Sequence, residues 1–146
     1  MLTIENKRTE TGSPADAKVV ETGTELYFAS GLLGFEINKQ FELVTDPELS
    51  PYQWLKGMDA DQSFLVIPPS YVVENYSIDL ADEDVALLGL ENPNDVVVLN
   101  IATYHVDETV TVNLKGPLVY NTVTKAARQV VPRNAADLSL AHPMGN

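Results

Sequence analysis

Short apolar segments separated by turn residues make up the first half of the chain. Residues 63–69 are almost all apolar, which is typical of a strand in the centre of a sheet, and two prolines end the run. Glycines at Gly31 and Gly34 interrupt an aromatic-rich segment and are expected where a positive φ angle or a close backbone approach is needed. Three further strands are predicted, at residues 25–36 with turns at those glycines, at 40–44 and at 52–58.

The second half of the chain carries the longest strand signal and then several shorter ones. Four strands are predicted there, at residues 96–106, 109–114, 118–121 and 128–131. Turns at Asp107 and Glu108, at Pro117 and over residues 122–127 separate them. Residues 2–4 are a further candidate for a short strand.

One helix is predicted, over residues 81–90. Its first turn carries three acidic residues that complement the helix dipole, Asp82, Glu83 and Asp84. Val85 and Leu88 are spaced to face the core, with Leu87 nearby, and Gly89 stands where a glycine ends a helix.

These elements predict an all-β, or strongly β-dominated, fold: a small antiparallel β-barrel-like domain with one short α-helix. About six to nine strands at a spacing of roughly ten residues suit a closed or rolled antiparallel barrel. The 146 residues form most simply one domain, 1–146. Residues 5–18 are polar and are expected to form a long loop or mobile arm, and residues 133–146 an irregular C-terminal tail.

Composition changes this picture mainly through charge. The chain has 21 acidic and 9 basic residues and a formal net charge of −12, which would repel a nucleic-acid backbone. The same field would attract a basic protein, although acidity also serves solubility. The chain has no Cys, which suits a reducing cytoplasm, and no apolar run long enough to span a membrane or direct secretion. A cytoplasmic protein that binds neither nucleic acid nor membrane is therefore expected.

Candidate catalytic and metal-binding residues are few. His105 and Asp107 fall on one face of the predicted strand, but a histidine beside a carboxylate at a strand edge is more common than a metal site. The paired carboxylates Asp59 and Asp61 are better explained as turn residues than as ligands. No nucleotide-binding, zinc-protease or serine-hydrolase motif occurs. We expect no enzyme activity, no metal and no cofactor.

Asparagines within apolar strands are the more informative feature. Asn100 lies inside a strand, and Asn113 and Asn121 lie at strand ends. Their amides would satisfy backbone groups where strands bulge or splay. Alternatively, they mark an exposed strand edge at which amides fix the register of a protein partner.

The order of segments resembles the flagellar assembly factor FliW family. The resemblance is carried by "GLLGFE", "WLKGMDADQSFLVIPP", "LADEDVALLGLENPNDVVVLNIAT" and "TVNLKGPLVYN…RQVV", and it covers residues 25–131. It is strongest over residues 80–121, where the helix, the Asn-Pro turn and two strands follow in family order. The ending His142-Pro143-Met144 also looks like the family's C-terminus.

This resemblance implies a non-enzymatic flagellar assembly factor. Such a protein binds the RNA-binding translational regulator CsrA away from its RNA site, relieving repression of flagellin translation, and alternatively binds flagellin. The resemblance places no contact residues. From exposure and charge we expect a protein-binding surface made of Asp82, Glu83, Asp84, Asn113, Lys115 and Asn121.

Two other functions are compatible with the residues. Trp54 and Tyr52 near turns would suit a β-barrel module that binds a small ligand or carbohydrate in its interior. A metal-assisted hydrolase would use His105, Asp107 and Glu108. A filled barrel would contradict the first alternative.

Overall fold

A computed structural model describes residues 2–7, 23–32, 34, 36, 39–58 and 62–144. Within this part of the chain the strands are β1 (Leu2–Lys7), β2 (Thr24–Phe28), β3 (Gln40–Thr45), β4 (Gln53–Gly57), β5 (Ser63–Ile67), β6 (Asn75–Leu80), β7 (Val96–Tyr104), β8 (Val110–Val112), β9 (Leu118–Asn121), β10 (Ala126–Gln129) and β11 (His142–Pro143). The helix α1 spans Asp82–Leu88, and short 3-10 helices span Pro47–Leu49, Pro69–Tyr71, Pro93–Asp95 and Ala135–Asp137.

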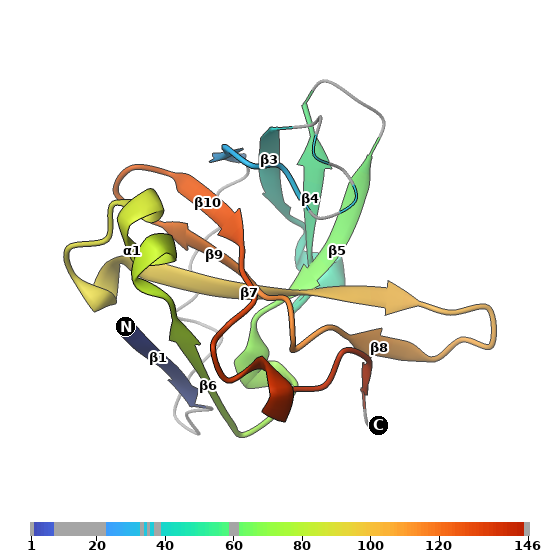
Figure 1. Cartoon of the computed structure of the whole chain (residues 1–146). Helices are drawn as coiled ribbons and strands as arrows, with labels where there is room; N and C mark the ends of the chain where they lie inside the picture. The colour runs from blue at the N-terminus through green and yellow to red at the C-terminus, as the bar shows by residue number, and fades with distance from the viewer. Residues whose placement is uncertain are drawn as a thin grey trace.

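Seven strands close into a ring (Figure 1). The order is β7, β5, β4, β3, β2, β10, β9 and back to β7, so each ring strand has a neighbour on both sides over part of its length. The predicted β-dominated, barrel-like fold is confirmed, as is the central position of β5 between β4 and β7. One pairing departs from the antiparallel expectation, because β2 and β10 run parallel. Parallel pairing requires a long connection, and here residues 29–125, about two-thirds of the chain, lie between the two strands.

Apolar side chains fill the barrel. Its interior is lined by Leu26, Phe28, Leu32, Phe41, Leu43, Leu55, Val66, Leu99, Leu118 and Ala127. Phe28 and Phe41 meet edge to face with their ring centroids 5.3 Å apart, and both are essentially inaccessible to solvent. The alternative of a small ligand or carbohydrate held inside the barrel is therefore wrong for the described residues. A ring of seven strands is narrow enough for side chains alone to occupy it.

A second core lies outside the barrel. There β1 and β6 form a two-stranded antiparallel sheet, and with α1 they cover the outer face of β7 and β9. Ile4, Ile78 and Leu80 pack in this layer against Val98 and Val119. The other face of β7 looks into the barrel, so β7 is buried on both sides. This explains why residues 96–99 of β7 are all apolar instead of alternating, whereas Thr103 and Tyr104, at the far end of the strand, are exposed.

The helix α1 forms close to its predicted bounds. Gly89 follows it in the left-handed conformation, with φ 64°, as expected for a glycine that ends a helix. Val85 and Leu88 face the second core, whereas Leu87 points to solvent. Positive φ angles at Gly31 and Gly34 are also confirmed. A Cβ at Gly31 would lie 2.5 Å from the backbone of Glu36, so a close backbone approach adds to the need for glycine there.

Several elements differ from their predicted bounds. The strand β6 was not predicted, and it pairs with β1, which extends to Lys7. Residues 5–7 of the expected loop over residues 5–18 therefore belong to a strand, and residues 8–18 lie outside the described part. The tail, expected to be irregular, contains a 3-10 helix and β11, which pairs with β8. Finally, β10 starts at Ala126, two residues before the predicted strand.

Candidate functional site

The strands β8 and β9 follow the same edge of β7, and residues 113–117 bulge out between them. Asn113 closes this bulge, because its Oδ1 accepts hydrogen bonds from the backbone N–H groups of Lys115 at 2.9 Å and Gly116 at 2.8 Å. Gln129 donates to the carbonyl oxygen of Gly116 at 3.0 Å. The amide at Asn113 therefore satisfies backbone groups where the ladder is interrupted, the first of the two interpretations offered by the sequence.

Asn100 ties this bulge to the second core. Its Nδ2 donates to the carbonyl oxygen of Asn113 at 3.0 Å and to the hydroxyl of Tyr76 at 3.3 Å. Tyr76 in turn donates to the carbonyl oxygen of Leu114 through a short hydrogen bond. Burial raises the pKa of the Tyr76 hydroxyl to about 12. Among the described residues, the Asn100 Oδ1 is a buried side-chain oxygen without a hydrogen-bond partner.

Asn121 joins two turns at the other end of β9. Its Nδ2 donates to the carbonyl oxygens of Leu88 and Gly89, at 3.0 and 3.2 Å, and so satisfies the C-terminus of α1. Its Oδ1 accepts from the N–H groups of Val123 and Thr124, which form the turn into β10. The side chain is 3% exposed, so its amide is not presented at the surface. The expectation that Asn121 belongs to an exposed surface is wrong, because its amide is used within the fold.

The three acidic residues of the first turn of α1 also differ in burial. Asp84 is buried and accepts from the Nε of Arg128 at 2.7 Å, and the guanidinium also donates to the hydroxyl of Ser30. Asp84 therefore fixes α1 on β10 and is a poor candidate for direct partner contact. Asp82 and Glu83 are exposed on the same turn.

The six expected interface residues therefore do not form one surface. Asp82 and Glu83 lie on the first turn of α1, whose other end contacts the buried Asn121, whereas Asn113 and Lys115 lie in the bulge that precedes β9. Asn113 and Lys115 are half-buried, and Asn113 is committed to its turn through Oδ1. A protein-binding role stays a prediction for the exposed residues Asp82 and Glu83.

The hairpin between β7 and β8 holds the residues considered for a hydrolase. His105 Nε2 lies 2.7 Å from the hydroxyl of Thr111, and Asp107 accepts from the N–H and hydroxyl of Thr109. These hydrogen bonds from Thr109 lower the pKa of Asp107. The side chains thus shape a turn, and within the described residues no group of three or more His, Cys, Asp or Glu side chains is placed to hold a metal ion. Asp59 and Asp61 lie outside that part.

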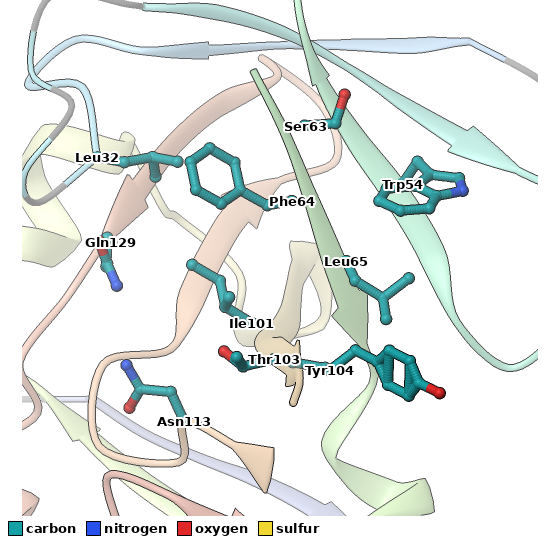
Figure 2. Close-up of a pocket in the computed structure, with 11 residues that line it drawn as sticks. Leu32, Trp54, Ser63, Phe64, Leu65, Ile101, Thr103, Tyr104, Asn113 and Gln129 are labelled. Atoms are coloured by element: carbon teal, nitrogen blue, oxygen red, sulfur yellow. The ribbon is translucent and has the colours of Figure 1, made fainter. Parts of the chain in front are cut away.

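A cavity of about 570 Å³ opens where β5 and β7 separate (Figure 2). Its wall is largely apolar, with amides at one side, and it is lined by Leu32, Trp54, Ser63, Phe64, Leu65, Ile101, Ala102, Thr103, Tyr104, Asn113 and Gln129. The sequence pointed to Trp54 as a ligand-binding residue inside a barrel; in the structure Trp54 lines this cavity, where the pairing of β5 with β7 stops, together with Leu32 of the barrel interior. No local pattern predicts this feature, since it depends on where the pairing of two strands stops.

Comparison with known proteins identifies the class of molecule. Residues 4–144 match the family model described as FliW protein. A flagellar assembly factor FliW from Clostridium botulinum is 32% identical over 124 residues, which are 84% of this chain and 87% of that protein. The Bacillus subtilis protein of the same name is 33% identical over 122 residues, covering 82% and 85%. The crystal structure of a flagellar assembly factor FliW superposes with a TM-score of 0.74 at 26% identity, covering 95% of both chains.

Fold and sequence together define a small, closed β-barrel with a covering layer of two strands and a helix. The chain belongs to the FliW family. No helix in the described part of the chain is long and apolar enough to cross a membrane.

Proposed function

We propose that this protein is a cytoplasmic, non-enzymatic flagellar assembly factor whose partners are a CsrA-type RNA-binding regulator and flagellin. The observation that carries the proposal is the match to proteins named flagellar assembly factor along nearly the whole chain. In this proposal, flagellin occupies the protein until flagellin is exported. The freed protein then binds the regulator away from its RNA site and relieves repression of flagellin translation.

The charge of the chain supports a basic partner. A net charge of −12 speeds the encounter with a positively charged protein and disfavours nucleic acid as a direct ligand. Docked beside an RNA-binding surface, the same field lowers the affinity of that surface for RNA. Linkage then requires that RNA weaken the docking of this protein by the same factor.

Binding measurements with purified components test the proposal. We expect one copy of this protein to bind per subunit of the CsrA-type regulator and, separately, to bind flagellin. The association rate with the regulator should fall as salt rises, because charge steers the encounter. Absence of binding to both proteins, in calorimetry and in co-purification from a flagellated host, contradicts the proposal.

A second measurement tests the allosteric part. Titrating the regulator with its RNA at several fixed concentrations of this protein should give a decrease in RNA affinity that reaches a limit. The reciprocal titration should show the same limiting factor. A decrease that continues without limit as more protein is added indicates competition for the RNA site and overturns the allosteric mechanism.

A further inference from the structure

The pairing of β5 with β7 stops before either strand ends. Its last registered pair is Leu65 with Ala102, yet β5 begins at Ser63 and β7 continues to Tyr104. Beyond this pair the strands diverge: β5 stays with β4, and β7 continues into its hairpin with β8 (Figure 1). We call the space between the diverging strands, with the lining residues of the 570 Å³ cavity given above, the wedge.

Main-chain groups of both strands face the wedge. His105 donates its N–H to the carbonyl oxygen of Thr109 across the β7–β8 hairpin, and by the alternation of an antiparallel ladder Thr103 also faces β8 whereas Tyr104 faces away from it. Gly57 donates to the carbonyl oxygen of Gln62, so by the same alternation Ser63 faces away from β4. If the β5–β7 ladder continued, Phe64 would lie opposite Thr103, and Ser63 with Tyr104 would form the next hydrogen-bonded pair; Ser63 and Tyr104 are both exposed.

The side chains around the wedge form two layers, as they do on the two faces of a sheet. Figure 2 shows Phe64 and Ile101 on one side of β5 and Trp54, Leu65 and Tyr104 on the other. Trp54 is directly opposite Leu65 in the β4–β5 ladder. A strand lying between β5 and β7 would therefore find apolar side chains on both of its faces.

We propose that the wedge binds an extended segment of a partner protein, which adds a short strand between Ser63 and Tyr104. Main-chain hydrogen bonding at a free strand edge selects an extended peptide, and the two apolar layers select apolar side chains on it. The exposed Asp107 and Glu108 of the adjoining hairpin, and the net charge of −12, favour a Lys or Arg next to those side chains. The identity of the segment rests on the proposed function, which supplies flagellin and the CsrA-type regulator as its sources.

Proline at Ser63 provides the sharpest test. Ser63→Pro removes the N–H that faces the wedge, and the first residue of a strand is a position that tolerates proline. Ser63→Ala is the matched control, because it removes the hydroxyl and keeps the N–H. Trp54 is the single tryptophan of the chain and lines the wedge, so its fluorescence reports occupancy without a label.

The probes are the purified regulator, purified flagellin and a display library of short random peptides. We expect at least one of the two proteins to change the Trp54 emission of the wild type and of Ser63→Ala, and to bind Ser63→Pro about tenfold more weakly. Equal binding to all three chains without a change in Trp54 emission overturns the wedge as the site and leaves the proposed function intact.

If neither protein binds the wild type, the proposed function fails. The display library of random peptides then tests the wedge on its own. Enrichment by the wild type of peptides that combine apolar residues with Lys or Arg, lost on Ser63→Pro, then supports the wedge as a peptide site. The same peptides enriched equally by Ser63→Pro, or no enrichment at all, overturn it.

Discussion

The two ends of β7 contrast sharply. At Val96 to Leu99 the strand is paired with β9, and the buried amide of Asn121 fastens the end of that strand to α1 and to the next turn. At Thr103 and Tyr104 the edge that faces β5 has lost its neighbour, and a cavity opens instead. One strand thus has an end whose ladder with β9 is closed by a buried amide, and an end whose main-chain groups facing β5 have no ladder partner. The difference suggests that the first end holds the fold together and the second is the one able to accept a partner.

Removing the Asn121 amide should give the largest effect. Asn121→Ala leaves the last carbonyl oxygens of α1 and two N–H groups of the turn without their partner, and we expect a loss of about 3 to 4 kcal/mol in the free energy of unfolding. Urea denaturation measures it. Asn92→Ala serves as the control, since Asn92 caps an exposed turn through one hydrogen bond, and should cost about 1 kcal/mol. Equal losses for the two variants contradict the special role of Asn121.

High pH should lower the free energy of unfolding through the middle of β7, where Asn100 contacts Tyr76. The pKa of Tyr76 is raised from 10.0 to about 12, so the unfolded chain releases this proton first. The stabilising contribution is complete below pH 10 and is lost as the pH rises through 12, amounting to about 2 to 3 kcal/mol. Urea denaturation across this pH range measures how the free energy of unfolding changes with pH. Tyr76→Phe is the control, because it lacks the titrating hydroxyl. An unchanged slope in Tyr76→Phe assigns the titration to other groups.

A pair of prolines probes the open end directly. Thr103→Pro removes an N–H that faces β8, so we expect it to lower the free energy of unfolding by about 2 kcal/mol or more. Tyr104→Pro removes an N–H that faces the wedge, and its cost beyond that of Tyr104→Ala should be under about 1 kcal/mol. Thermal denaturation of the three variants provides the comparison. A larger loss for Tyr104→Pro than for Thr103→Pro would show that the edge is not free.

The smallest effect is expected for a conservative change in the ion pair between Arg128 and Asp84. Arg128→Lys keeps a positive charge near Asp84 but loses the planar group that also reaches Ser30, so we expect a loss of about 1 kcal/mol. Arg128→Ala should cost more, because it leaves the buried carboxylate of Asp84 unpaired. Chemical denaturation of both variants checks the order, and an equal loss would show that the charge contributes little.

Local pattern was sufficient for much of the fold. The apolar run at residues 63–69 predicted the central strand β5, and the acidic first turn with Gly89 predicted α1. The strand β6 was missed although Tyr76, Ile78 and Leu80 alternate in it, because its ladder among the described residues is with β1, some seventy residues earlier in the chain. Alternation indicates a strand, but the partner of a strand depends on long-range packing that no local window contains.

The candidate site was less accessible to sequence reasoning. The role of Asn113 in a bulge follows from the chemistry of an amide in an apolar ribbon, and the structure confirms it. The burial of Asn121 does not follow, because the carbonyl oxygens that it binds belong to a helix more than thirty residues away. No local sequence pattern predicts the wedge. It exists because two strands that share a ladder diverge, and this is a property of register alone.

The parallel pair formed by β2 and β10 has a consequence for how the chain acquires its shape. Tyr27 and Ala126 are neighbours in the ring although about a hundred residues separate them, so the ring cannot close until nearly the entire chain has left the ribosome. During synthesis the edge of β2 that pairs with β10 stays unpaired. Nascent chains truncated before residue 126 should therefore be sensitive to proteases and prone to aggregation, and a few more residues should abolish both properties.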